Sequence, residues 1–116
     1  MRRLTHWIIA MVSMTGMATA FSSALAGESK ADAGKLVYEK WCAPCHDPGI
    51  IHPGTHALMA KYANSKPAVL KEWTDLDPLF LRYTVRHGVS IMPQFRKTEI
   101  TDADLDALTA YLTHQH

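Results

Sequence analysis

Cysteine is scarce in this chain: the 116 residues include two, Cys42 and Cys45. So few cysteines exclude a fold held by several disulfides, which small secreted domains commonly need. The chain also has little net charge, with 12 basic and 11 acidic residues, and it has no basic run, so a nucleic-acid partner is not indicated. Apolar residues make up 47% of the sequence, which is typical of one ordinary globular domain.

Long apolar runs are missing except near the beginning. Two arginines precede a mostly apolar, uncharged stretch from Trp7 to Ala24, and small residues follow it. We therefore predict a secretory signal peptide over residues 1–26 and one domain over residues 27–116, in the periplasm and without stable membrane association. An uncleaved membrane anchor is the alternative, but hydroxyl residues and a glycine dilute the stretch below a good spanning helix.

The predicted mature domain is small, with 116 − 26 = 90 residues. A chain of this length is marginal for burying its own core and commonly depends on a disulfide, a metal or a cofactor. A buried cofactor would supply the missing core.

Both cysteines belong to the segment Trp41-Cys42-Ala43-Pro44-Cys45-His46, which contains Cys-x-x-Cys-His, the spacing that attaches a c-type haem. Two thiols about one helical turn apart reach two vinyl groups of one porphyrin, and the next histidine then presents its imidazole to the iron. The motif predicts one covalent haem c, bound through Cys42 and Cys45, with His46 as an axial ligand.

Three other kinds of site could use these cysteines, and the sequence favours none of them. A thioredoxin-like redox pair would follow a strand in a longer α/β domain, which this sequence does not provide. A structural zinc site needs four ligands and would have to recruit histidines at irregular distances, such as His52 and His56. A disulfide across so short a loop would constrain little of the unfolded chain.

Helices are predicted at both ends of the domain. Residues 34–41 form the first, with Asp32 as its N-cap, and Gly34 within it indicates a close approach by another helix. The last helix begins after Thr101, with Asp104 as the capping partner, and its apolar face carries Leu105, Leu108 and Leu112. We expect this last helix to be the one that approaches Gly34.

A further helix is predicted between these two, entered through Asp77-Pro78 and ended by Gly88. Prolines and glycines over residues 47–71 indicate mostly loop there, with one helical turn over residues 56–62. The predicted fold is all-α, with three to four helices around one haem.

Methionine supplies the candidates for a second axial ligand. Removal of the signal peptide leaves two methionines, Met59 and Met92. Met92 lies in a loop between Gly88, which can end the preceding helix, and Pro93, which stiffens the backbone, so it can close over the far face of a haem. Met59 lies among apolar residues and is interpreted as haem-pocket or core packing. We predict Met92 as the ligand, since a thioether raises the potential and suits an electron carrier.

Two alternatives to Met92 remain open at this point. A second histidine, from His87, His52 or His56, would give bis-histidine ligation, and an open sixth site would make the protein a haem catalyst or sensor. With both axial positions filled, the iron has no vacancy for a substrate, so we predict an electron-transfer protein and not an enzyme.

Other residues around the haem are predicted from their chemistry. Trp73 and Arg82 are candidate donors to a haem propionate, because an indole N–H or a guanidinium satisfies a buried carboxylate. An exposed haem edge would carry a small apolar docking patch, for which the candidates are Ala43, Pro44, Ile50, Ile51, Pro93, Gln94 and Phe95.

Over nearly the whole mature chain these residues resemble the class I cytochromes c. The likeness rests on the helix with Gly34 and Tyr38, the Cys-x-x-Cys-His motif, Met92-Pro93 and a closing helix with Tyr111. The resemblance implies an all-α class I fold whose first and last helices cross at Gly34 and Tyr111. It also implies that the proximal imidazole donates a hydrogen bond to a proline carbonyl after the motif, for which Pro53 is the candidate.

Residues 41–46, 52–55 and 86–93 also resemble the cytochrome subunits of bacterial flavocytochromes that oxidise 4-alkylphenols, such as 4-cresol dehydrogenase and eugenol hydroxylase. That resemblance implies a flavoprotein dehydrogenase of the vanillyl-alcohol-oxidase type as the electron donor, together with a downstream acceptor. The alternative is a freely diffusing carrier that serves another periplasmic dehydrogenase or oxidase.

Overall fold

The computed structural model describes residues 29–63 and 65–113, so the predicted signal peptide lies outside the described part. Helices of ten to twelve residues build the domain: α1 (Lys30–Trp41), α3 (Pro53–Tyr62), α4 (Pro78–His87) and α5 (Asp102–Thr113). A single-turn helix, α2 (Ala43–His46), and a 3-10 helix, η1 (Leu70–Glu72), complete the order. Within these described ranges, no helix has the length and apolar character needed to cross a membrane. The all-α prediction is confirmed.

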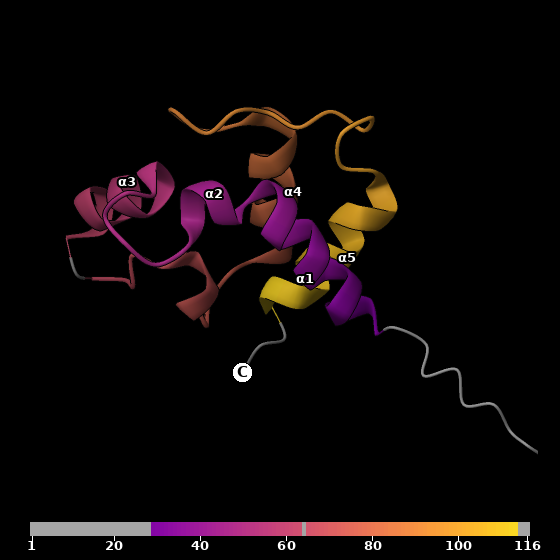
Figure 1. Cartoon of the computed structure of the whole chain (residues 1–116), viewed down its shortest axis with the longest axis horizontal. Coiled ribbons are helices and arrows are strands. Elements are labelled where there is room, and N and C mark those ends of the chain that lie inside the picture. The colour runs from indigo at the N-terminus through magenta and orange to yellow at the C-terminus, as the bar shows by residue number, and fades with distance from the viewer. Residues whose placement is uncertain (1–28, 64, 114–116) are drawn as a thin grey trace, which may run out of the picture.

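Helices α1 and α5 cross and pack closely together (Figure 1). The crossing depends on Gly34, because a Cβ atom at this position would lie 2.0 Å from the Ala107 carbonyl oxygen and 2.7 Å from Tyr111 Cβ. The rings of Tyr38 and Tyr111 pack beside it, with centroids 5.7 Å apart. The predicted close approach at Gly34 is confirmed, and it brings the two backbones into direct contact.

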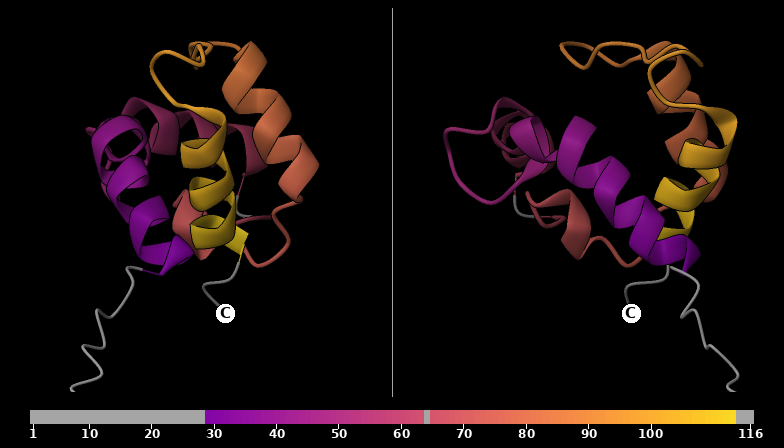
Figure 2. Two further views of the ribbon diagram at one scale, coloured as in Figure 1. Left: turned by 90° about the vertical axis from the view of Figure 1, so that its right-hand side faces the viewer. Right: turned by 45° about the vertical axis from the view of Figure 1, so that its right-hand side comes forward.

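Helix α5 lies between α1 and α4 (Figure 2). The predicted apolar face of α5 is buried and joins a core to which α1 and α4 also contribute, comprising Leu105, Leu108 and Leu112 with Tyr38, Leu81, Val85 and Ile100. Each such side chain stabilises the fold by about 1.5–3 kcal/mol relative to exposure. The core thus holds α5 in the middle of the domain.

The start of α1 differs from the prediction. Ser29 is the N-cap: its hydroxyl accepts the Asp32 N–H at 3.1 Å, while the Asp32 carboxylate accepts the Ser29 N–H at 3.2 Å. Asp32 is therefore the third residue of the helix and completes a capping box instead of capping the helix itself.

Helix α3 is longer than the single turn predicted within a loop. It begins at Pro53, in the first turn, where a proline is tolerated because its missing N–H would have no partner. It ends at Ala63, whose φ of 45° is left-handed. The interpretation of Pro53 and Gly54 as loop residues was wrong.

The ends of α4 and α5 follow the prediction. The Asp77 carboxylate accepts the Phe80 N–H at 2.7 Å, and Gly88, with φ of 72°, ends α4. Thr101 and Asp104 form a second capping box, in which each side chain accepts the other residue's N–H at 3.1 Å. These caps fix where the segment between α4 and α5 leaves one helix and joins the other.

Candidate functional site

A cavity of about 410 Å³ lies among the helices. This volume is within the range of about 300–1,000 Å³ that is typical of cofactor sites. Cys42, Cys45 and His46 line it together with Met92, which lies in the segment after α4. Most of the remaining wall is apolar, with side chains that include Leu58, Leu70, Trp73, Leu76, Leu81, Val85, Phe95, Leu108 and Leu112. The four residues predicted to bind haem thus line one apolar cavity.

The Cys-x-x-Cys-His motif lies where α1 ends and α2 begins. Cys42 is the C-cap of α1, and His46 is the last residue of α2. The buried Tyr38 hydroxyl donates a hydrogen bond to the His46 carbonyl at 3.1 Å, and the Thr55 hydroxyl donates to the Asp47 carbonyl at 2.9 Å. The backbone at the end of the motif is therefore held from both α1 and α3.

Burial shifts the pKa values of two side chains of the motif, His46 and Cys42. It lowers the pKa of His46, so the imidazole is neutral at neutral pH, the form in which histidine ligates a metal. Burial, followed by the neighbouring Cys45, raises the pKa of the Cys42 thiol to about 12. Cys42 and Cys45 do not form a disulfide with each other.

Two features around His46 show that the site fits a haem. Its ring lines the apolar cavity and is not tied to another residue through Nδ1, which is buried and has no hydrogen-bond partner. The ring also lies against Gly54, where a Cβ atom would come within 2.8 Å of His46 Cε1. A neutral, buried imidazole in a glycine-lined position beside two thiols is the donor set that a covalent haem requires.

The hydrogen bond predicted from His46 to Pro53 is absent, since Nδ1 has no partner. Pro53 is the first residue of α3, and a carbonyl in the first turn of a helix points along the axis toward the amide one turn later. Pro53 still lines the cavity beside the motif. Pro53 therefore lies next to the motif as predicted, but its carbonyl does not accept the predicted hydrogen bond from His46.

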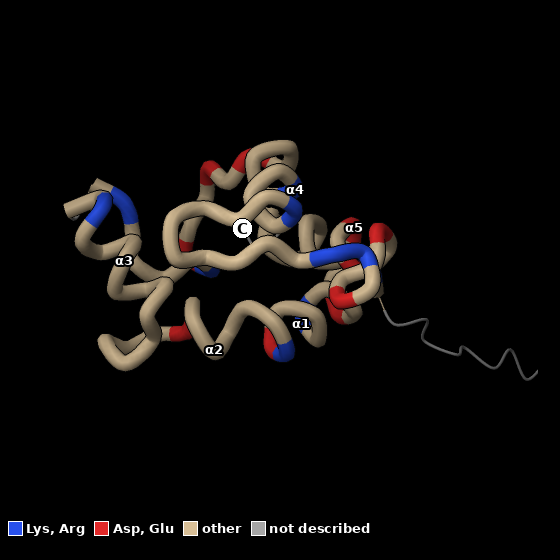
Figure 3. Tube along the Cα trace, turned by 90° about the horizontal axis from the view of Figure 1, so that it is seen from above, with Lys and Arg blue, Asp and Glu red and all other residues tan. Residues whose placement is uncertain are grey.

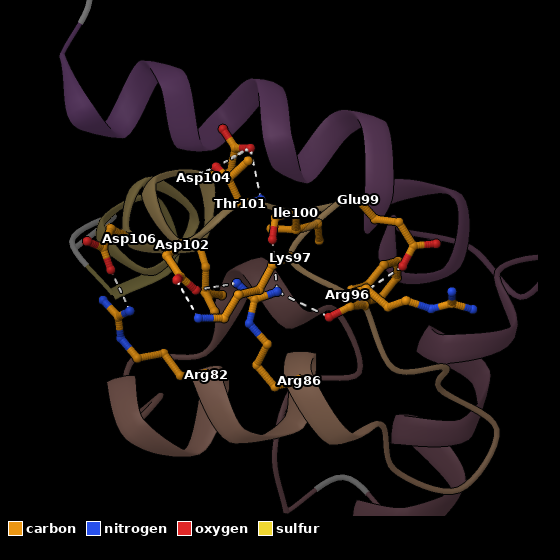
Figure 4. Close-up of polar contacts among 12 residues, drawn as sticks. Arg82, Arg86, Arg96, Lys97, Glu99, Ile100, Thr101, Asp102, Asp104 and Asp106 are labelled. Carbon is orange, nitrogen blue, oxygen red and sulfur yellow. Dashed lines mark hydrogen bonds and ion pairs between the residues drawn. The ribbon is translucent and has the colours of Figure 1, made fainter.

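The two predicted propionate donors differ in position. Trp73 lines the cavity, and its indole N–H donates to the Pro67 carbonyl at 2.8 Å. Arg82 does not line the cavity; it forms an ion pair with Asp106 of α5 (Figure 4). Lys61, which the sequence interpretation missed, is the cationic residue in the cavity wall. Its spacing of three from Leu58 would have indicated it, had α3 been predicted at full length.

Met92 is presented by a tight turn. The Val89 N–H donates to the Met92 carbonyl at 3.1 Å, and the Met92 N–H donates to the Val89 carbonyl at 2.9 Å. Ser90 within the turn has a left-handed φ of 55°. Gly88 is required beside it, because a Cβ atom there would lie 2.6 Å from the Met92 carbonyl oxygen. The turn places Met92 in the cavity wall.

None of the three rival histidines lines the cavity. The His87 ring stacks on Tyr83, with centroids 4.1 Å apart, and His52 Nδ1 lies 3.0 Å from the Pro44 carbonyl oxygen. His56 and Met59 line a separate, smaller cavity, so the haem-pocket interpretation of Met59 is not supported. In the part of the chain that the structure describes, no three His, Cys, Asp or Glu side chains gather as a zinc site would need.

A comparison with protein families gives one match. The model of the family described as cytochrome c oxidase, cbb3-type, subunit III matches residues 29–112, well over half of the chain. This chain belongs to that family. It is a monohaem class I c-type cytochrome, an electron-transfer protein whose cofactor is a covalently bound haem c and whose role implies redox partner proteins. Searches of curated proteins and of solved structures gave no match.

The rim of the cytochrome's cavity is apolar. Residues 88–95, which include the Met92 turn, carry no Lys, Arg, Asp or Glu, whereas charges gather on the segment and helix that follow (Figure 3). Ile91 lines the cavity and is 68% exposed. Ile50 and Ile51, predicted for the docking patch, are exposed but do not line the cavity. The apolar surface next to the cavity therefore centres on the Met92 turn.

Proposed function

We propose that this cytochrome carries single electrons in the periplasm, with Cys42 and Cys45 attaching the haem and His46 and Met92 as its axial ligands. The observation that carries the proposal is that these four side chains line one apolar cavity. When bound, the haem supplies a reversible one-electron couple between Fe(III) and Fe(II).

Each part of the chain contributes to that role. The apolar wall excludes water from the site, and a dry site strengthens every electrostatic influence on the iron. The neutral His46 imidazole is ready to ligate. A hydrogen bond from Tyr38 holds the His46 carbonyl, and one from Thr55 holds the carbonyl of the next residue, Asp47. The Met92 thioether favours reduced iron. The exposed Ile91 and Pro93 form an apolar surface at the cavity rim, suited to brief contact with a redox partner.

The Met92→Ala variant of the holocytochrome tests the ligand assignment. Its reduction potential should fall by a large part of the roughly 0.8 V that axial ligands span, and its ferric form should bind cyanide without first displacing a thioether. Met59→Ala is the matched control and should leave both properties unchanged, since Met59 lies outside the cavity. An unchanged potential in Met92→Ala would exclude the thioether ligand and favour an open site or bis-histidine ligation.

We propose a flavoprotein dehydrogenase acting on 4-alkylphenols as the electron donor. The support is the likeness of residues 41–46, 52–55 and 86–93 to the cytochrome subunits of such flavocytochromes. The test is to fractionate the native periplasm on a sizing column and record the absorption of every red fraction. Flavin that co-elutes with haem at a mass well above the cytochrome alone supports a fixed subunit. Haem that elutes alone near monomer size favours a diffusible carrier.

A further inference from the structure

The side chain of Arg86 joins three parts of the chain. Its Nη1 donates to the Phe95 carbonyl at 3.1 Å and to the Ile100 carbonyl at 2.8 Å, and its Nη2 donates to Asp102 Oδ1 at 2.9 Å (Figure 4). The side chain is 17% exposed, so these bonds are largely shielded from water. One guanidinium thus connects α4, the segment after Met92 and the first turn of α5.

These bonds hold the segment on the far side of Met92. The near side is fixed where Gly88 ends α4, and the far side returns to α4 at Phe95, whose N–H donates to the Val85 carbonyl at 2.8 Å. Arg86 reinforces this return by binding the Phe95 carbonyl. Met92 therefore lies in a short span that is tied to α4 at both ends.

We propose that Arg86 is a positioning residue for Met92: by holding residues 95–100 against α4, it keeps the Met92 turn closed over the cavity. This inference rests on the proposed function, in which Met92 is an axial ligand. The planar guanidinium has five donors in a fixed fork and binds two carbonyls and a carboxylate at once. A lysine ammonium keeps the charge but not this geometry.

The test measures how fast external imidazole replaces Met92 in the ferric holocytochrome, followed by loss of the methionine–iron charge-transfer band. Arg86→Gln removes the charge and the fork, and Arg86→Lys removes the fork alone. Arg82→Gln is the matched control, since Arg82 lies one turn earlier on α4 and pairs with Asp106 of the same helix α5. Denaturant unfolding of each variant reports overall stability.

We expect replacement to be about tenfold faster or more in Arg86→Gln, clearly faster in Arg86→Lys, and unchanged in Arg82→Gln, since hydrogen bonds to a charged group are the strong ones. If the role of Arg86 were merely structural, the two Arg86 variants would be less stable to denaturant, but imidazole would replace Met92 no faster in them than in Arg82→Gln. Wild-type rates in both Arg86 variants, or equal acceleration by Arg82→Gln, would overturn the inference while leaving Met92 as the ligand.

Failure of the proposed function gives a different result. A wild-type protein without the methionine–iron band would refute the ligand assignment before Arg86 is tested. If Arg86→Gln does not accumulate as a folded protein, Asp102→Asn and Arg86→Lys carry the same test. Asp102→Asn removes the charged acceptor and leaves the two carbonyl bonds, so its acceleration should be smaller than that of Arg86→Lys.

Discussion

At Gly34 the backbones of α1 and α5 touch, and the atom that a side chain would meet is the Ala107 carbonyl oxygen. Because that oxygen belongs to a helix backbone, Gly34→Ala must push the two helices apart. Overpacking of this kind costs about 1–3 kcal/mol, more than the roughly 1 kcal/mol that alanine gains as a helix former. Denaturant unfolding of the holocytochrome should therefore show a lower midpoint.

Lys35→Ala is the control for that change, because Lys35 is exposed on α1 and its ion pair with Glu39 is a surface one. Its effect should stay within about 0.5 kcal/mol. A Gly34→Ala protein as stable as the wild type would show that the two helices separate freely and that the crossing is not held at this point.

Asp102 provides a pH-dependent test at a single residue. Hydrogen bonds from Lys97 and then Arg86 hold the pKa of its carboxyl below the ordinary value of 3.8. A lowered pKa in the folded state means that the carboxylate stabilises the fold above its unfolded pKa and that this contribution is lost as the pH falls. The wild type should thus exceed Asp102→Asn in stability above about pH 5, and the difference should shrink below pH 3.8. Unfolding curves from pH 7 to pH 2 measure it; a constant difference across that range would contradict the assignment.

At the scale of an element, the contribution of the capping box at the start of α5 to the stability of the domain can be measured. Thr101→Ala leaves the Asp104 N–H without its acceptor and should destabilise the domain by about 1 kcal/mol. Thr101→Ser keeps the hydroxyl and should restore most of the loss. The measurement is thermal unfolding followed by helical circular dichroism, and equal losses in the two variants would assign the effect to the threonine methyl group instead.

The ends of the helices show which features of the fold can be predicted from neighbouring residues in the sequence. Asp77-Pro78 and Gly88 marked α4 correctly, because each acts within its own turn. Asp32 misled because an acidic residue in the first turn fits both the cap and the third position, and Ser29 before it decides between them. Gly54 was interpreted as a loop residue, but it lies in α3. A glycine is needed there because it makes room for the His46 ring, a contact between two segments that local sequence does not reveal.

The residues of the site also differ in how far local sequence predicts them. Cys42, Cys45 and His46 were predicted because the spacing of the motif itself defines the chemistry, and these residues do line the cavity with Met92. Arg82, a predicted propionate donor, does not line the cavity, and Lys61, which does line it, was not predicted. The position of Arg82 depends on the packing of α4 against α5, where it pairs with Asp106, so no local pattern decides it. Lys61 follows the local pattern of α3, which was predicted too short.

For the molecule as a whole, the cavity makes the cofactor part of the core. Replacing both Cys42 and Cys45 by alanine removes covalent attachment, and without haem the apolar walls from several helices would face a space of about 410 Å³. A domain this small has little other core to compensate. We expect the double variant to lose cooperative unfolding and much of its helical circular dichroism. A haem-free chain with the wild-type helical signal and a sharp transition would show that the helices pack without the cofactor.

The pairing of α1 with α5 also sets an order of events during biogenesis. The first helix finds its main partner at the other end of the domain, so the core stays open until the last residues of the chain are available. The cysteines follow α1 directly and are therefore synthesised before α5, the helix that covers that face. We therefore expect both thiols to stay accessible for haem attachment until the final helix packs against α1 and covers the cofactor.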